Sequence, residues 1–249
     1  MKILIFNQKG GVGKTTTAVN LGAALARLGR DRVTLVDLDP QTHLTAAWGL
    51  RAESHSWNVS GWLAGEPGQP VAIGERLFLV PGDCQATEPR PFANPLITTD
   101  GVVIIDAPPS WNDTVARLMT DIDRVLTPLE ADFLGMQGIN RLLQTMKRAD
   151  VSWSRLRLLV CRYDVRLAIH REVRERLVQR FRNGALLPVV VRSSVRLAEA
   201  PGFGVSIFDH APASTGAMDY EAVARIFLNE MDEVRPGSAF PFAKSVEAS

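Results

Sequence analysis

The chain has 249 residues, of which 46% are hydrophobic and 22% charged, and its formal net charge is +1. No segment approaches the ~18 consecutive apolar residues that a membrane-spanning helix needs, which disfavours an integral membrane protein. Two distant cysteines, Cys84 and Cys161, suggest neither a metal cluster nor a disulfide framework, so we expect a cytoplasmic protein. The length predicts a single α/β domain over residues 1–234, followed by a loose tail over residues 235–249.

In chain order, short apolar runs alternate with longer segments of helical periodicity. This alternation predicts β-α-β units and a twisted, mostly parallel sheet that is flanked by helices on both faces. We expect strands at residues 2–6, 32–37, 77–80, 102–106, 124–128, 156–161 and 187–191. We expect helices at residues 14–28, 115–120, 137–148, 168–181 and 216–232, and an irregular surface excursion at residues 49–75.

A glycine-rich segment at residues 7–16 lies between the first expected strand and the first expected helix. In this arrangement backbone N–H groups and the helix N-terminus surround phosphates. Lys14 is placed to reach the β- and γ-phosphates, Thr15 to hold Mg²⁺, and Thr16 to bond the α-phosphate. The predicted phosphate-binding residues are Gly10, Gly11, Val12, Gly13, Lys14, Thr15 and Thr16. We therefore expect a P-loop NTPase fold that binds a nucleoside triphosphate.

Three aspartates lie at the ends of two expected strands. Asp37 and Asp39 are two residues apart at the end of one strand, and Asp106 ends another. An i, i+2 spacing places two side chains on one face of a strand. Because ligands of parallel sheets bind at the carboxyl ends of the strands, we expect the glycine loop and these carboxylates to share one crevice. The alternative for Asp37 and Asp106 is to cap the helix that follows the strand.

Four ordered blocks resemble those of the ParA/MinD ATPases, including their deviant Walker motif. They are KGGVGKTT at residues 9–16, LVDLDPQ at residues 35–41, VIIDAPPS at residues 103–110 and SVRLAEAPGFG at residues 194–204. The last block is similar to a ParA motif rather than a MinD one, and the resemblance covers about residues 1–232.

The resemblance implies ATP hydrolysis with Mg²⁺ and assigns residue roles. It implies that Lys9 reaches across a dimer interface to the partner's nucleotide and that Asp39 positions the attacking water. The catalytic residues are then Lys9, Lys14 and Asp39, and the metal partners are Thr15, Asp37 and Asp106. It also places Asp132 near the dimer face and residues 161–164 near adenine, where Arg162 departs from the threonine- or asparagine-like residue expected there.

Charge is distributed unevenly along the chain. Between Lys147 and Arg196 there are thirteen basic and four acidic residues, a local balance of +9, so the remainder carries −8. Arginine dominates this segment and suits bidentate phosphate contacts, which favours sequence-independent DNA binding over an ordinary solvated face. The candidate DNA-binding residues are Arg192, Arg196, Arg166, Arg171 and Arg174.

The expected helix at residues 168–181 has apolar side chains at every fourth position. Ile169, Val173, Leu177 and Phe181 form this repeat, which predicts one buried stripe. The arginines between them are expected to face outward.

As a whole, the resemblance implies a ParA-like ATPase that forms an ATP-sandwich homodimer and binds non-specific nucleoid DNA. Such a protein positions or segregates a cargo (a plasmid, a chromosome, a carboxysome or another intracellular body). A cargo-linked ParB-like or adaptor protein would stimulate hydrolysis, as would DNA, and no membrane is involved.

Three other functions are alternatives. A MinD-like membrane-associated ATPase is the nearest, but such proteins end in a basic amphipathic helix, whereas residues 220–234 are acidic. An iron–sulfur reductase of the nitrogenase iron-protein type needs a cysteine soon after Asp106, and residues 107–114 contain none. A nucleotide-binding scaffold without turnover remains open.

Overall fold

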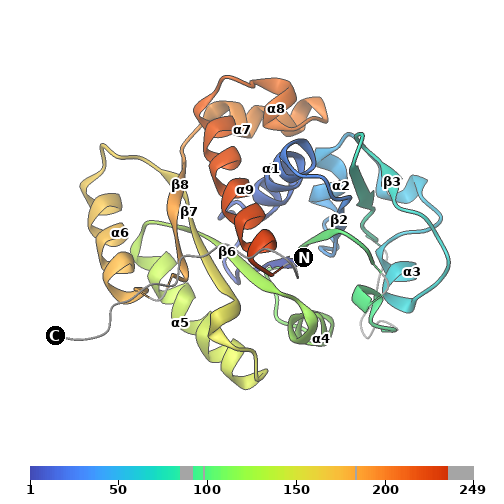
Figure 1. Ribbon diagram of the computed structural model, residues 1–249, viewed down its shortest axis with the longest axis horizontal. Helices are drawn as coiled ribbons and strands as arrows, with labels where there is room; N and C mark the ends of the chain where they lie inside the picture. Colours follow the sequence, from blue (N-terminus) through green and yellow to red (C-terminus); the bar gives the residue numbers. More distant parts are fainter. Residues whose placement is uncertain (85–91, 98, 183, 235–249) are drawn as a thin grey trace.

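The computed structural model describes residues 1–84, 92–97, 99–182 and 184–234, so the expected tail lies outside the described residues. Eight strands form one sheet in the order β3-β4-β2-β5-β1-β6-β7-β8 (Figure 1). All neighbouring strands are parallel except β3 and β4, which are antiparallel. The strands are β1 (Lys2–Ile5), β2 (Val33–Asp37), β3 (Val71–Ala72), β4 (Leu77–Val80), β5 (Val102–Asp106), β6 (Arg124–Glu130), β7 (Leu156–Tyr163) and β8 (Leu186–Arg192).

Helices of very different length connect these strands. The helices are α1 (Lys14–Leu28), α2 (His43–Ala47), α3 (Val59–Ala64), α4 (Asp113–Asp121), α5 (Phe133–Arg148), α6 (Ala168–Arg180), α7 (Val195–Glu199), α8 (Ile207–His210) and α9 (Thr215–Val234). Short 3₁₀ turns are η1 (Ala52–Ser54), η2 (Pro95–Ile97), η3 (Trp153–Arg155) and η4 (Ala200–Phe203). Each described helix is too short or too polar to cross a membrane.

Two hydrophobic cores lie on opposite faces of the sheet. Because successive side chains of a strand point to opposite faces, Ile3 and Ile5 pack with α1 and α9, whereas Leu4 and Phe6 pack with α3, α4 and α5 (Figure 1). Strands covered on both sides are continuously apolar, as in β5, where every residue is buried. The predicted fold class, a mostly parallel sheet with helices on both faces, is confirmed.

The first core depends on a close approach between α1 and the sheet. Gly22 faces β2, and a β-carbon at this position would lie 2.5 Å from the Leu35 Cδ2 atom, which belongs to a fully buried side chain. Helix α9 packs on α1 in the same core, where the Tyr220 hydroxyl lies 3.1 Å from the Thr17 hydroxyl.

Two sequence-based expectations were wrong. Residues 49–75 are not simply an irregular excursion, because α3 forms there and buries Val59, Trp62 and Leu63 in the second core. In α6 only Val173 and Leu177 of the expected stripe are buried, while Ile169 is 49% exposed at the beginning of the helix. The middle of α6, not its first turn, is what packs on the sheet.

Candidate functional site

The glycine loop connects β1 directly to α1. Asn7 fixes its beginning, since its side-chain amide donates to the Pro128 carbonyl at 2.8 Å and its oxygen accepts the Lys9 N–H at 3.0 Å. Gly11 and Gly13 have φ angles of 77° and 96°, in the left-handed region that favours glycine. Gly13 is the N-cap of α1 and has no side chain to bond the first N–H groups of the helix. Those donors are therefore available to an anion at the helix N-terminus.

Lys14 begins α1 and is buried beside the loop. Its Nζ atom lies 3.4 Å from the Lys9 carbonyl oxygen, so the side chain folds back over the loop. Burial lowers the pKa of Lys14, and the carboxylates of Asp106 and Asp39 oppose that shift. A cation held in this way is positioned to neutralise a phosphate bound by the loop.

Thr15 and Asp106 form a direct hydrogen bond at the end of β5. The Thr15 hydroxyl donates to Asp106 Oδ2 at 2.6 Å, which leaves the oxygen lone pairs of Thr15 free to bind a metal ion. The other carboxylate oxygen of Asp106 is buried and has no hydrogen-bond partner among the described residues. Burial raises the pKa of Asp106, and the nearby charge of Asp37 raises it further.

Asp37 lies next to Asp106, since the two residues are partners in the β2–β5 ladder. Its Oδ2 atom accepts hydrogen bonds from the N–H of Thr45 at 2.8 Å and from the Thr45 hydroxyl at 2.7 Å. Asp37 therefore does cap α2, the alternative that the sequence left open. Its Oδ1 atom is buried and unpartnered within the described part of the chain, and burial raises the pKa of the carboxyl.

These residues fit Mg²⁺ bound together with a nucleotide. Magnesium in such sites is held through one or two carboxylates, directly or through water, while substrate phosphates supply other ligands. The unpartnered oxygens of Asp37 and Asp106 and the hydroxyl of Thr15 are ligands of the kind that magnesium uses in such sites. In the described segments no group of three or more His, Cys, Asp or Glu side chains is placed to hold a metal by itself.

Asp39 lies beyond the end of β2, not on the strand. Its Oδ1 atom accepts the Gln41 N–H at 3.0 Å, and its carbonyl accepts the Thr42 N–H at 2.8 Å, which closes a turn. Strand alternation does not place Asp39, because the strand ends at Asp37, but the charge of Asp39 still acts on Lys14, Asp37 and Asp106. The turn leaves Asp39 half-buried, whereas Asp37 is inaccessible.

Lys9 is bound within its own chain. Its Nζ atom lies 2.9 Å from Glu130 Oε2 and 3.0 Å from Asp132 Oδ2. Arg162 contacts the second oxygen of Glu130 at 3.2 Å and the Gly11 carbonyl at 3.3 Å, so it lies against the glycine loop. Sequence reasoning missed Glu130, although its place after an expected strand on the carboxyl edge of the sheet was the available signal.

The five candidate DNA-binding arginines lie apart from the loop, in or next to α6, β8 and α7. Arg192 makes a bidentate ion pair with Asp219 and Arg196 bonds Glu199. Arg166 bonds Asp164, and hydrogen bonds from Arg166 lower the pKa of Asp164 to about 2. The other two donate to carbonyl oxygens, Arg171 to Val165 and Arg174 to Pro188.

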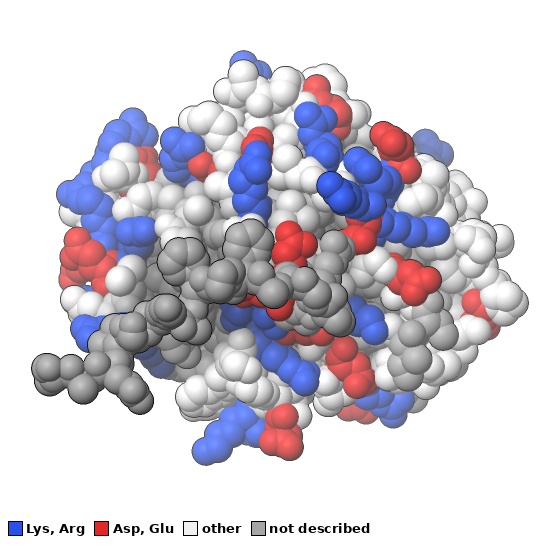
Figure 2. Space-filling view, viewed as in Figure 1, with Lys and Arg blue, Asp and Glu red and all other residues white. Residues whose placement is uncertain are grey.

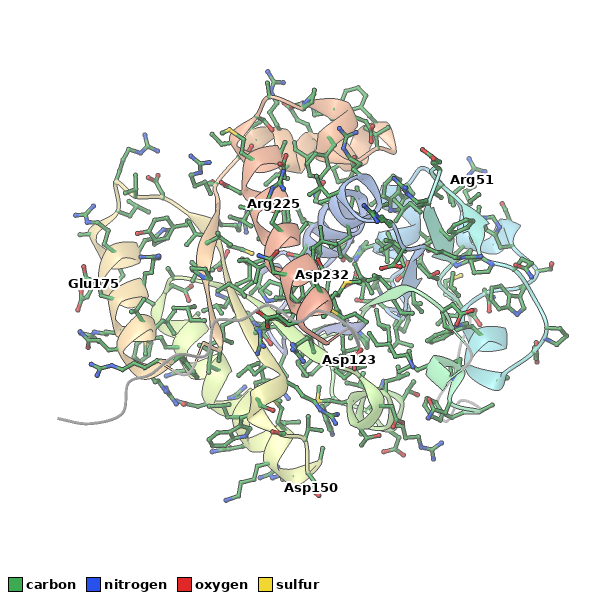
Figure 3. The ribbon with its side chains drawn as sticks, viewed as in Figure 1. Arg51, Asp123, Asp150, Glu175, Arg225 and Asp232 are labelled. Carbon is green, nitrogen blue, oxygen red and sulfur yellow. The ribbon has the colours of Figure 1, made fainter. Side chains whose placement is uncertain are left out.

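Basic side chains gather over α6, at the left edge of the molecule in Figure 2. Acidic side chains interrupt this edge, as at Glu175, which points outward from α6 in Figure 3. The basic surface is therefore less uniform than the local charge balance predicts.

A cavity of about 790 Å³ lies elsewhere, between α1, the β3–β4 turn and α8. Its lining includes Arg27, Trp48 and Phe208 but no residue of the glycine loop. The loop instead lies at the carboxyl end of the central strand β1, where Gly10 and Gly11 are exposed.

Comparisons with known proteins agree with this geometry. The model of the CobQ/CobB/MinD/ParA nucleotide binding domain matches residues 3–207. The chromosome-partitioning ATPase Soj of Thermus thermophilus is 38% identical over 246 residues, which cover 93% of this chain and 97% of that protein. The chromosome partitioning protein ParA of Caulobacter vibrioides is 32% identical, with 90% of this chain and 92% of that protein covered.

Solved structures show the same fold. The cobyrinic acid a,c-diamide synthase of Mycobacterium smegmatis, with a bound ATP analogue and magnesium, has a TM-score of 0.73 and 29% sequence identity, covering 94% of this chain and 96% of that one. The resemblance predicted from the four ordered blocks is confirmed. The chain belongs to the CobQ/CobB/MinD/ParA nucleotide-binding family, in which it is similar to the Soj and ParA ATPases.

Proposed function

We propose that this chain is a ParA/Soj-like ATPase that segregates or positions a cargo on nucleoid DNA. In this proposal residues 1–234 act as one ATPase domain, and two copies form a dimer with ATP between them. The observation that carries the proposal is the cluster behind the glycine loop, where Thr15 bonds Asp106 and two buried carboxylate oxygens remain unpartnered among the described residues. The Soj and ParA relatives, a chromosome-partitioning ATPase and a chromosome partitioning protein, support it.

Each residue of the site has a role in this reaction. Backbone N–H groups of the loop bind the phosphates, and Lys14 neutralises charge on them. Bound Mg²⁺ would supply charge neutralisation for the leaving group, and Thr15, Asp106 and Asp37 are the residues that would hold it, the carboxylates through water. Asp39, in the turn that follows β2, orients the attacking water. The Lys9 of a second copy stabilises the negative charge that develops on the phosphates in the transition state.

DNA binding and partner stimulation complete the proposed cycle. Phosphate contacts by exposed arginines near α6 and α7 give sequence-independent binding, which weakens with salt. A ParB-like or adaptor protein on the cargo then stimulates hydrolysis and releases the dimer from the nucleoid.

The structure gives a reason to prefer this cycle over a MinD-like one. In α9 the apolar side chains of Tyr220, Val223 and Phe227 are buried against α1, so this face is not available to lipid. Glu230, near the end of α9, is bound by Arg124 and Arg157.

Phosphate release and DNA co-sedimentation test the proposal together. Wild-type protein is expected to release phosphate slowly, only with Mg²⁺, and with a rate per molecule that rises with protein concentration. Lys14→Ala should abolish turnover, and Asp39→Ala should bind ATP, stay dimeric and sediment with non-specific DNA at low salt. A nucleotide-loaded Asp39→Ala protein that stays monomeric at high concentration would falsify the proposal.

A further inference from the structure

The ammonium group of Lys9 lies between two carboxylates of its own subunit. Glu130 is the last residue of β6, and Asp132 is the N-cap of α5. The Asp132 carboxylate accepts the Gly135 N–H at 2.5 Å. Both carboxylates are therefore held by regular secondary structure, and the Lys9 side chain is only 29% exposed. We refer to Glu130 and Asp132 as the Lys9 carboxylate pair.

Arg162 fixes one member of the pair independently of Lys9. Glu130 uses Oε2 for Lys9 and Oε1 for Arg162, so the two cations bind different oxygens of one carboxylate. Arg162 also donates to the Gly11 carbonyl and has a φ angle of 53°, a left-handed conformation uncommon for a residue with a side chain. Arg162 thus links Glu130 to β7 and to the glycine loop through contacts that do not involve Lys9.

We propose that Glu130 and Asp132 are positioning residues for Lys9, which hold its ammonium group in its own subunit until a second triphosphate displaces them, while Arg162 retains Glu130. The inference rests on the proposed function, because it needs a nucleotide-bridged dimer in which the triphosphate of a second copy comes within reach of Lys9. Lys9 must exchange two carboxylates for phosphate oxygens on dimerisation. The exchange favours a triphosphate over a diphosphate, since the γ-phosphate adds charge and acceptors where Lys9 has to arrive.

The electrostatics of the separate subunit agree with this assignment. Burial alone would lower the pKa of Lys9, but the hydrogen bonds and negative charges of Glu130 and Asp132 outweigh it and raise the pKa above 10.5. The charged form of Lys9 is thus more stable beside the pair than in water. Removal of the pair should reverse the direction of the shift, because the burial remains.

The first test uses the nucleotide-free protein and needs no dimer. The lysines are labelled with ¹³C at Cε, Lys9 is assigned by its loss in Lys9→Arg, and the pKa values are measured by NMR. The Lys9 pKa should be clearly lower in Glu130→Gln/Asp132→Asn than in the wild type. Asp150→Asn, at the opposite end of α5 (Figure 3), removes a carboxylate without touching Lys9 and should leave its pKa unchanged. An equal Lys9 pKa in the wild type and the double variant overturns the inference.

The second test measures dimerisation in the Asp39→Ala background by sedimentation equilibrium with ATP and Mg²⁺. Glu130→Gln and Asp132→Asn should each tighten the dimer about fivefold, and together they should permit measurable dimerisation with ADP. Asparagine is itself a good N-cap, so Asp132→Asn preserves the beginning of α5. Asp150→Asn again serves as the matched control.

The two failures are distinguishable. Variants that dimerise no more tightly than their Asp39→Ala parent overturn the role of the pair and leave the proposed function standing. A parent that never dimerises overturns the proposed function and with it the release of Lys9, whatever the NMR titration shows of the separate subunit.

Discussion

At the scale of single residues, the most unusual environment is that of Asp37 and Asp106. Both are buried, they are neighbours in the sheet, and each has one oxygen without a partner among the described residues. Burial raises the pKa of Asp37 to about 6, and burial together with the charge of Asp37 raises that of Asp106 to about 8. The two adjacent carboxylates repel each other, and the nearby charge of Lys14 offsets this only in part, so the nucleotide-free protein carries a cost that ligand binding removes.

The pH dependence of stability follows from these shifts. The ordinary pKa of an aspartate carboxyl is 3.8. Because the folded-state pKa values of Asp37 and Asp106 lie above it, the folded chain retains protons that the unfolded chain has released. Stability of the nucleotide-free protein should therefore fall as the pH rises from about 4 to about 8. Asp106→Asn should flatten this fall and raise the free energy of unfolding at pH 8 by on the order of 2 kcal/mol, as measured by urea denaturation. A less stable variant at pH 8 would contradict this account.

Asp106→Asn should also bind ATP and Mg²⁺ more weakly. The amide that replaces the Asp106 carboxylate would still accept the Thr15 hydroxyl but carries no negative charge for a hydrated metal ion. We expect Mg²⁺-dependent ATP affinity, measured by calorimetry, to fall by at least about tenfold, or 1.4 kcal/mol. A gain in stability combined with a loss of binding is typical of a buried functional charge.

At the scale of elements, the beginning of α5 is the most constrained segment of the site. A β-carbon at Gly135 would overlap the carbonyl oxygen of Glu130, a backbone atom that no side-chain rotation can move away. Gly135→Ala should therefore lower the free energy of unfolding by about 1–3 kcal/mol and disturb Lys9 through Glu130 and Asp132. Thermal unfolding and the Lys9 titration measure the two effects.

The control is another glycine of the same helix. A β-carbon at Gly138 would lie 3.8 Å from Asn7 Oδ1, an ordinary contact. Gly138→Ala should leave stability unchanged or raise it by up to ~1 kcal/mol, because alanine favours helix. If both variants are equally stable, the close approach of α5 to β6 is not the constraint we describe.

Elements with strong local patterns were predictable from the sequence, and those fixed by distant contacts were not. The expected strands at residues 77–80 and 102–106 have the bounds of β4 and β5, because uninterrupted apolar runs mark them. The short helix α2 was missed, since its stabilising cap, Asp37, belongs to a separate strand.

The same distinction holds for the residues of the candidate site. The glycine loop and the three aspartates were identifiable from their spacing, and their catalytic and metal-binding roles stay predictions. The pairing of Lys9 with Glu130 joins residues 121 positions apart, and it depends on β1 and β6 being neighbours in the sheet. Sequence spacing carries no such information.

At the scale of the whole molecule, one of the candidate DNA-binding arginines, Arg192, also connects two elements of the fold. Arg192 is paired with Asp219, whose side chain is only 9% exposed, and thereby ties β8 to α9. Arg192→Ala should lower the free energy of unfolding by about 1–2 kcal/mol, because it leaves Asp219 unpaired. Arg196→Ala, which removes an exposed pair, should change it by less than about 0.5 kcal/mol.

The contrast between these arginines identifies the useful probe of DNA binding. In the ATP-bound Asp39→Ala protein, Arg196→Ala should weaken DNA binding and reduce the slope of log K against log salt by about one. The affinities are measured by fluorescence anisotropy over a series of salt concentrations. An unchanged slope removes Arg196 from the DNA-binding surface.

Asn20 joins the beginning of α1 to the beginning of α8. Its amide nitrogen donates to the Thr16 carbonyl, and its amide oxygen accepts the N–H of Ile207, the first residue of α8. One planar group thus connects the first turn of α1 with the segment that follows Arg196. Hydrogen–deuterium exchange at the Ile207 amide should slow when ATP orders that turn, and Asn20→Ala should abolish the difference. A single carboxamide would then be the link by which an occupied phosphate site alters the beginning of α8.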